Sequence, residues 1–324
     1  MKEFASLIEK LEEGLKAIEI PKNPANLYKP ISYTLALGGK RLRPLLTLLA
    51  QRIFDKSSNL AITPALAVEV FHNFTLIHDD IMDKAPLRRG KPTVYKKWNT
   101  NVAILSGDVM MVQAYQLLQV LEPNLLAKTI PLFNKCAIEV CEGQQYDMDF
   151  ETRDNVSESE YIEMIRLKTA VLLGFALEMG ALIGGASEKE AKTLCKFGQK
   201  VGIGFQLKDD LLDVYGDKKT FGKQVGGDII SNKKTFLLIY ALKMANTSQK
   251  KTLDEWITKV NFDETEKVNA VTELYNQIGV KEATEKEMNT YFDEAFELLE
   301  KIEGYDEGKE QLKLFTEKLI DRIN

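Results

Sequence analysis

The helical character of this chain is clearest in Val70-Phe71-His72-Asn73-Phe74-Thr75-Leu76-Ile77, an apolar run that leads into Asp79-Asp80-Ile81-Met82-Asp83. A second apolar run, residues 202–207, leads into Asp209-Asp210-Leu211-Leu212-Asp213. Aspartate is a poor residue for a helix interior and is costly to bury unpaired, so each acidic cluster needs a compensating charge. One such cluster could be a solvated helix face, but its repetition in the same setting argues against that explanation for both.

The spacing of the acids favours a divalent cation as that charge. Because residues four positions apart share a helix face, Asp79 can act with Asp83, and Asp209 with Asp213. Only oxygen ligands are offered, and no Cys or His stands at metal-ligand spacing, which favours Mg²⁺ or Mn²⁺ over Zn²⁺. Mg²⁺ completes its coordination with phosphate oxygens, so a phosphorylated small molecule is the expected ligand. The predicted metal ligands are Asp79, Asp80, Asp83, Asp209, Asp210 and Asp213.

Basic residues follow each acidic cluster. Arg88-Arg89-Gly90-Lys91 comes after the first, and Gly222-Lys223 and then Asn232-Lys233-Lys234 come after the second. Arginine and lysine neutralise phosphate charge, so this arrangement is complementary to a diphosphate. Upstream, Gly38-Gly39-Lys40-Arg41-Leu42-Arg43-Pro44 concentrates positive charge in a predicted turn between two helices. Basic residues at helix ends are also common for dipole reasons, so this turn alone is a weak signal.

The rest of the chain indicates an all-α architecture. Apolar residues recur with helical spacing, and sustained strand alternation is missing. No linker rich in Pro, Ser or Gly divides the 324 residues, so we expect residues 1–324 to form one helical domain with two acidic faces across a central cavity. Breaks between the predicted helices fall at Pro21, Pro30, Pro64, Pro86 and Pro123.

Bulk properties exclude several classes of protein. The formal net charge of −5 argues against nucleic acid as a partner. Three cysteines without metal or redox spacing fit reduced thiols and a cytoplasmic location. The amphipathic N-terminus is too charged for a signal peptide. We expect no transmembrane segment, because the apolar stretch 170–186 is short and contains Glu178, as a buried core helix would.

Together these motifs resemble the trans-isoprenyl diphosphate synthases, which condense isopentenyl diphosphate with an allylic diphosphate. The resemblance extends from about Tyr33 to Lys234 and includes the GGKRLRP turn, LIHDDIMD, LRRGKPT, the Lys168-Thr169 pair and GFQLKDDLLD. It implies a large helical bundle of the isoprenoid synthase type with a central active-site cavity. It also implies a homodimer and a dependence on Mg²⁺, with three ions in each active site and Mn²⁺ as an alternative.

The resemblance also implies roles for individual residues. The six aspartates would bind Mg²⁺ ions that bridge to the allylic diphosphate. The same diphosphate would be contacted by Arg88, Lys168, Lys223 and Lys233. Isopentenyl diphosphate would be held by Lys40, Arg43, His72 and Arg89. Thr169 and Gln206 would direct oxygens toward the developing carbocation. The Phe205 ring would line the pocket.

The length of the product is also implied by the resemblance. In the family, the fifth residue before the first aspartate forms a floor for the growing chain, and here that residue is Phe74, followed by Thr75. This pattern is similar to enzymes that make geranylgeranyl diphosphate (C20). An ideal helix places Phe74 about 140° and Thr75 about 40° from Asp79, so helix geometry alone does not identify the floor.

Three alternatives remain open from the sequence. Farnesyl diphosphate (C15) is the main competing product. A terpene cyclase usually replaces the second acidic cluster and lacks the GGKRLRP turn. A non-catalytic partner subunit of a heteromeric synthase would be expected to have lost one cluster, whereas both are intact.

Overall fold

The computed structural model describes residues 2–57, 59–216 and 226–321. The chain forms two compact units: the first comprises residues 1–136, 172–195 and 302–315, and the second comprises residues 137–171, 196–301 and 316–324. Both units are helical, which confirms the predicted all-α class. The single domain over residues 1–324 stays a prediction. In the described ranges, no helix combines the length and apolarity needed to cross a membrane.

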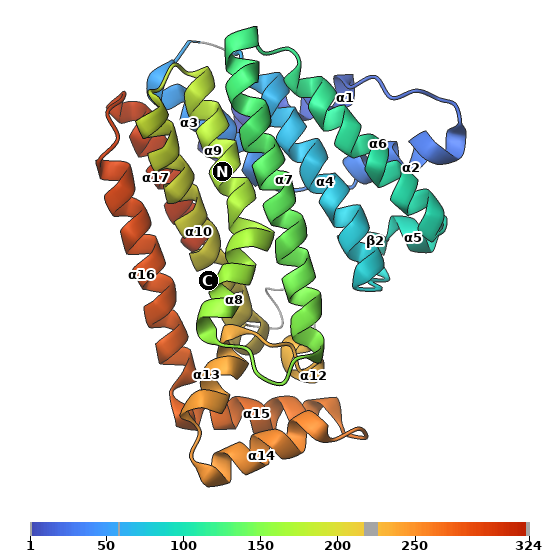
Figure 1. Cartoon of the computed structure of the whole chain (residues 1–324), viewed down its shortest axis with the longest axis vertical. Helices are drawn as coiled ribbons and strands as arrows, with labels where there is room; N and C mark the ends of the chain where they lie inside the picture. The colour runs from blue at the N-terminus through green and yellow to red at the C-terminus, as the bar shows by residue number, and fades with distance from the viewer. Residues whose placement is uncertain (1, 58, 217–225, 322–324) are drawn as a thin grey trace. The chain divides into compact units, whose positions relative to one another are not determined.

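The first unit is built around α4, the helix that carries the first acidic cluster. In Figure 1, α4 lies beside α6, and α1 and α3 also pack against α4. The helices that contribute to this unit are α1 (Ala5–Ala17), α2 (Ala25–Ala36), α3 (Leu42–Phe54), α4 (Ile62–Met82), α5 (Val94–Lys97), α6 (Thr100–Leu118), part of α7 (Pro123–Thr152), most of α9 (Val171–Ile183), the start of α10 (Glu188–Tyr215) and part of α17 (Asp306–Asp321), after a 3₁₀ turn η1 (Lys2–Phe4).

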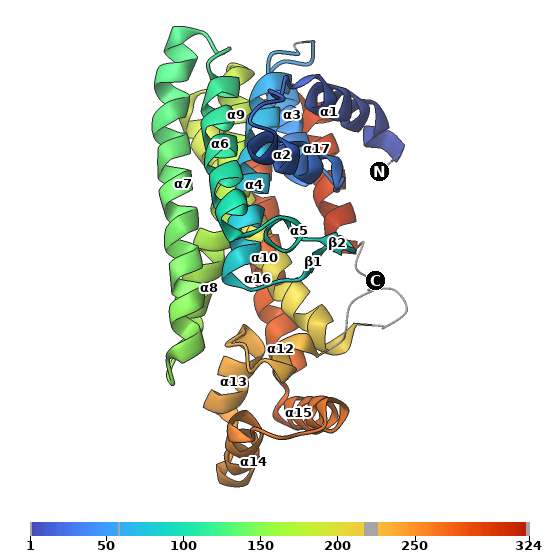
Figure 2. The same ribbon diagram turned by 90° about the vertical axis from the view of Figure 1, so that its right-hand side faces the viewer.

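A short hairpin follows α4. Strands β1 (Leu87–Arg88) and β2 (Lys91–Pro92) are antiparallel, with Leu87 opposite Pro92 and Arg88 opposite Lys91 (Figure 2). Arg89 and Gly90 form its turn, and both have positive φ. The hairpin reverses the chain at the point where the sequence predicted a basic loop, so it brings Arg88 back toward the end of α4.

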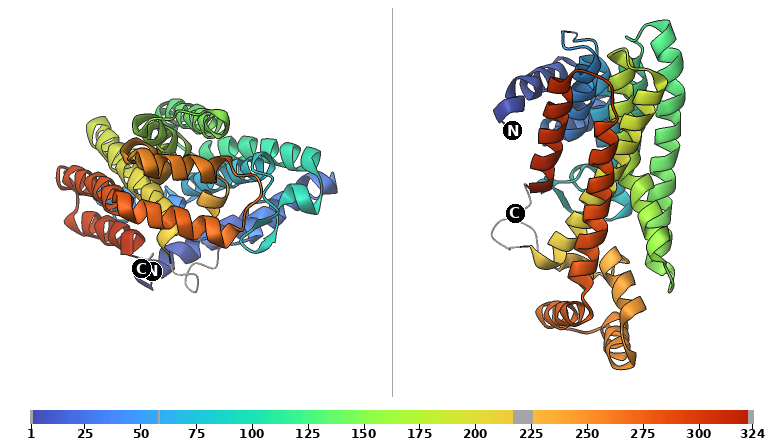
Figure 3. Two further views of the ribbon diagram at one scale, coloured as in Figure 1. Left: turned by 90° about the horizontal axis from the view of Figure 1, so that it is seen from below. Right: turned by 90° about the vertical axis from the view of Figure 1, so that its left-hand side faces the viewer.

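The second unit contains the later part of α10, which carries the second acidic cluster. Helices α14 and α15, orange in Figure 3, pack against each other, and α15 also contacts α12 and α13. Besides parts of α7, α10 and α17, the elements of this unit are α8 (Glu158–Ile165), the π-helix η2 (Arg166–Ala170), α12 (Gly227–Ile230), α13 (Phe236–Met244), α14 (Thr247–Thr258), α15 (Glu264–Ile278) and α16 (Val280–Glu300).

Local sequence explains most helix positions. The amphipathic N-terminus forms α1, which buries Leu7, Leu11 and Leu15 at i, i+4 spacing. The apolar stretch predicted as a core helix forms α9. Pro64 stands in the first turn of α4, where its missing N–H has no intrahelical acceptor, so the predicted break before this helix is confirmed. Pro30, also predicted as a break, instead lies further along α2 and is buried there.

Candidate functional site

The first acidic cluster ends α4 in the first unit. Asp80 is only 4 % exposed, whereas Asp83 lies on the surface. The hairpin places the Arg88 guanidinium against the cluster: Nε donates to Asp80 Oδ1 at 2.8 Å, and NH2 lies 2.7 Å from Asp80 Oδ1 and 3.4 Å from Asp79 Oδ2. Burial raises the pKa of Asp80, and Arg88 opposes that shift. Two carboxylates therefore converge on one cationic nitrogen.

A group of basic side chains surrounds the turn between α2 and α3. Gly39 has a φ of 152°, and a Cβ there would come within 2.9 Å of the Arg89 guanidinium, so Arg89 lies directly over the turn. Arg43 NH1 donates to His72 Nε2 at 3.1 Å. The buried Arg43 Nε has no hydrogen-bond partner within the described ranges of the chain. The exposed Lys40 stands on the same turn. The structure thus brings together Arg43, His72 and Arg89, three of the four residues that the family resemblance assigned to isopentenyl diphosphate.

His72 is neutral in this setting. Burial lowers the pKa of His72 well below its ordinary value, and the positive charges of Arg43 and Arg89 lower it further. A neutral imidazole has one nitrogen that can accept the hydrogen bond from Arg43. The His72 ring therefore helps to hold the Arg43 side chain in place without adding positive charge to this group of basic residues.

The sequence analysis missed Arg41, which fixes this turn. Arg41 is 2 % exposed and has a left-handed φ of 49°. Its Nε donates to Glu12 Oε1 at 2.7 Å and its NH1 to Glu69 Oε1 at 2.6 Å, while NH2 donates to the Leu35 carbonyl at 3.2 Å. Glu69 was the available signal, because a lone acid inside the apolar run of α4 requires a buried partner.

The second acidic cluster lies on α10 in the second unit. Asp210 is 4 % exposed; its Oδ2 accepts a short hydrogen bond from the Tyr161 hydroxyl, and its Oδ1 accepts one from Gln206 Nε2 at 3.3 Å. The Thr169 hydroxyl donates to Gln206 Oε1 at 3.3 Å. Burial raises the pKa of Asp210 to about 8, against the hydrogen bond from Tyr161. Thr169, Gln206 and Asp210 therefore form one hydrogen-bonded chain, and sequence reasoning missed Tyr161.

The other two aspartates of this cluster are partly buried. Asp213 Oδ2 accepts a hydrogen bond from the backbone N–H of Asp228 at 2.9 Å, which ties α10 to the start of α12. Asp209 stands one residue before Asp210 on the helix. Asp228 was not predicted as a site residue. It lies four residues before Asn232, the first residue of the basic segment Asn232-Lys233-Lys234.

Two predicted lysines meet at an acid that the sequence analysis overlooked. Lys168 Nζ lies 2.6 Å from Asp147 Oδ2, and Lys233 Nζ lies 3.9 Å from the same oxygen. Burial acts to raise the pKa of Asp147, but the two lysines outweigh it, so the pKa is lowered. Lys168 stands in the π-helix η2, which approaches α7 so closely that a Cβ on Gly143 would lie 2.2 Å from the Lys168 nitrogen. Such π-turns are frequent at functional sites.

The remaining predicted residues have simpler surroundings. The Phe74 ring lies 4.8 Å from the His78 ring and 5.5 Å from the Phe71 ring, between centroids. The Thr75 hydroxyl donates to the His72 carbonyl at 2.8 Å. Phe205 is partly buried on α10. Lys223 lies outside the described residues.

The donor chemistry fits a hard divalent cation. Asp79 and Asp80 already turn oxygens toward one positive nitrogen, and Asp210 is a buried carboxyl hydrogen-bonded to a neutral hydroxyl and a neutral amide. Mg²⁺ commonly takes only one or two protein carboxylates. Over the described ranges, no three His, Cys or acidic side chains form a preassembled metal site.

Known proteins resemble this chain in sequence and in fold. The model of the polyprenyl synthetase family matches residues 24–278. A geranylgeranyl diphosphate synthase of Methanosarcina mazei is 45 % identical over 222 residues, which are 68 % of each chain. A crystal structure of a geranylgeranyl pyrophosphate synthase superposes with a TM-score of 0.94 at 45 % identity and covers 99 % of both chains. A geranylgeranyl pyrophosphate synthase of Corynebacterium glutamicum, complexed with isoprenyl diphosphate and magnesium, matches with a TM-score of 0.83 at 29 % identity over 97 % of both chains.

Proposed function

We propose how this chain acts from the fact that it belongs to the polyprenyl synthetase family and is a trans-prenyltransferase. It condenses isopentenyl diphosphate head-to-tail with allylic diphosphates (dimethylallyl, geranyl and farnesyl), releases pyrophosphate and makes geranylgeranyl diphosphate. Relatives named for that C20 product at 45 % identity support this length over the C15 farnesyl product. The family match and two intact acidic clusters also disfavour a terpene cyclase and a non-catalytic subunit.

One observation carries the proposal: the positive charge of a basic side chain acts on the buried aspartate of each acidic cluster. In the first unit, Arg88 contacts both Asp79 and Asp80. In the second unit, the positive charge of Lys233 acts on Asp210. Carboxylates beside fixed cations suit a diphosphate bound together with divalent metal, since neither charge type alone matches that ligand.

The chain's own residues then have distinct tasks. Arg88, Lys168, Lys223 and Lys233 stabilise the negative charge that grows on the departing diphosphate. The six aspartates would hold Mg²⁺, which would supply further charge stabilisation as a Lewis acid. Lys40, Arg43, His72 and Arg89 orient isopentenyl diphosphate for attack. The oxygens of Thr169 and Gln206 stabilise the allylic cation while the Phe205 ring excludes water, which would otherwise quench it to an alcohol.

The finer parts of the proposal concern metal, assembly and location. We expect three Mg²⁺ ions at each active site, with Mn²⁺ as a substitute, and a cytoplasmic enzyme.

We also expect a homodimer. Helix α6 supports this, because Leu105 and Val112 lie seven residues apart on one face and are each 57 % exposed. A Leu105→Glu, Val112→Glu variant should then elute as a monomer in gel filtration.

Sizing the products tests the function. Purified protein is incubated with Mg²⁺, isopentenyl diphosphate and one allylic primer of C5, C10 or C15. We expect all-trans C20 diphosphate from each primer. Product that stops at C15 would identify a farnesyl diphosphate synthase, and an absence of elongation with every primer would contradict the proposed activity.

A further inference from the structure

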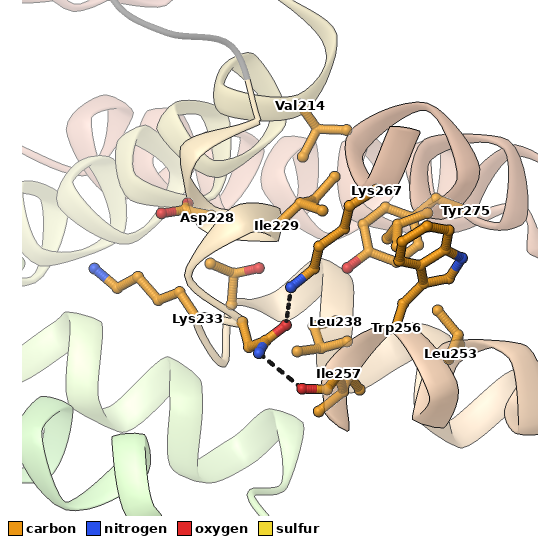
Figure 4. Close-up of a pocket in the computed structure, with 13 residues that line it drawn as sticks. Val214, Asp228, Ile229, Lys233, Leu238, Leu253, Trp256, Ile257, Lys267 and Tyr275 are labelled. Carbon is orange, nitrogen blue, oxygen red and sulfur yellow. Dashed lines mark hydrogen bonds between the residues drawn. The ribbon is translucent and has the colours of Figure 1, made fainter. Parts of the chain in front are cut away.

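A buried lysine that the proposed chemistry does not use lies on α15 of the second unit. Lys267 is 1 % exposed, and a lysine is rarely buried to this extent unless its charge is partnered. Its Nζ donates to Asn232 Oδ1 at 2.7 Å, the dashed line at Lys267 in Figure 4. Nζ also donates to the Ile230 carbonyl at 3.2 Å and lies 4.3 Å from the centroid of the Phe262 ring. Ile230 is the last residue of α12, and Asn232 lies just after that helix.

These contacts fix the backbone at the end of α12 and just after it. Asn232 has a left-handed φ of 55°, a conformation that needs local support. Its Nδ2 donates to the Ile257 carbonyl at 3.0 Å, so one amide side chain connects the turn to α14 and, through Lys267, to α15. The cavity bounded by these residues has a volume of about 10 Å³, room for about one water molecule. The turn is therefore tightly packed.

The next residue is Lys233, which the proposed function places on the diphosphate. Its backbone N–H donates to the Asp228 carbonyl at 2.9 Å, and Asp228 is itself bound through its own N–H to Asp213. In Figure 4, the Lys233 side chain extends away from Lys267, and its Nζ lies 3.9 Å from Asp147. The segment from Asp228 to Lys233 is thus held by Asp213 at its start and by Lys267 near its end.

We propose that Lys267 is a positioning residue for Lys233. Lys267 itself binds no substrate. It holds the Asn232 turn so that the Lys233 ammonium group points in one direction. Lys233 then loses less conformational freedom when the diphosphate binds and ionises. The inference rests on the proposed function, because it requires that Lys233 act on the leaving group.

The test is a pair of substitutions analysed in two backgrounds. Lys267→Met keeps an unbranched side chain, one atom shorter, and removes its charge. Asn232→Gly keeps the left-handed backbone and removes the bridging amide. Each is expected to lower kcat about tenfold while KM for the allylic diphosphate changes less than about threefold, because the lost interaction forms with the transition state. In a Lys233→Ala background, neither should lower kcat further. Lys243→Met, on the surface of the same unit, is the matched control and should keep the wild-type kcat.

The two backgrounds separate positioning from general stability. If Lys267→Met lowers kcat equally with and without Lys233, or lowers only the melting temperature, the inference is overturned. If Lys267→Met does not fold, Asn232→Gly decides by the same criterion. Wild-type protein that elongates no primer overturns the proposed function itself, and with it this inference, whereas an active wild type without the Lys233 dependence overturns the inference alone.

Discussion

The two acidic clusters have the same sequence pattern but different hydrogen-bond partners. Asp80 and Asp210 hold corresponding positions, and each is 4 % exposed. Arg88 neutralises Asp80 with charged hydrogen bonds, whereas Asp210 accepts its hydrogen bonds from the uncharged Tyr161 and Gln206. Burial raises the pKa of both carboxyls. A repeated motif therefore fixes the ligand type, while the residues packed around it decide how much charge the protein itself supplies.

The largest effect is expected when either carboxylate is removed. Asp80→Asn and Asp210→Asn should each lower kcat by about 10²–10³-fold, because each loses a metal ligand that stabilises the departing diphosphate. The control is Asp306→Asn on the surface of the first unit, expected to remain within about twofold of wild type. Loss of activity from only one of the two substitutions would show that the clusters are not equivalent in function.

The same two variants should differ in stability. Asp80→Asn removes the ion pair with Arg88 and should lower the free energy of unfolding by about 1–2 kcal/mol. Asp210→Asn should cost about 0.5 kcal/mol or less, because an amide oxygen can accept from Tyr161 while its NH₂ donates to a rotated Gln206. Denaturant unfolding of metal-free protein measures both values, and equal losses would contradict the electrostatic difference between the clusters.

Helices α4 and α10 also differ upstream of their acidic clusters. In α4 this stretch contains His72. Because the pKa of His72 is lowered in the folded state, the unfolded chain binds its proton more readily. Its contribution to stability is therefore complete above about pH 6.5 and is lost as the pH falls below that value. His72→Gln should reduce the slope of unfolding free energy against pH between 7 and 5 by at most about 1.4 kcal/mol per unit. An unchanged slope would show that the ring is not desolvated.

The smallest expected change concerns product length rather than rate. Phe74 on α4 contacts the rings of Phe71 and His78, and its truncation opens space one turn before Asp79. Phe74→Ala should lengthen the product by about one isoprene unit, whereas Phe54→Ala on α3 should leave it unchanged. Chromatography of the dephosphorylated products distinguishes the two, and an unchanged length in Phe74→Ala would remove this residue from the floor.

The sequence was sufficient for the fold class, the acidic clusters and the basic turn, because helical periodicity and motif spacing are local properties. The family resemblance also implied that Arg43, His72 and Arg89 act together, and the structure brings them together. It did not find Asp147 or Tyr161, because each lies far along the chain from its partner and neither belongs to a motif.

Prolines show a similar limit of sequence reasoning. Pro30 was predicted as a helix break, yet it is buried within α2, where tertiary packing outweighs the lost hydrogen bond. The conformation of Asn232 was likewise not predictable, because it is supported by Lys267 from another helix. For Asn232 the deciding contact is long-range.

The most direct test of the account is the binding of inorganic pyrophosphate by calorimetry, with and without Mg²⁺. We predict that Mg²⁺ strengthens pyrophosphate binding to the wild type, and that Asp80→Asn and Asp210→Asn each abolish this strengthening while the Asp306→Asn control retains it. Metal-dependent binding that survives both substitutions would contradict the claim that the two acidic clusters hold a metal-bound diphosphate.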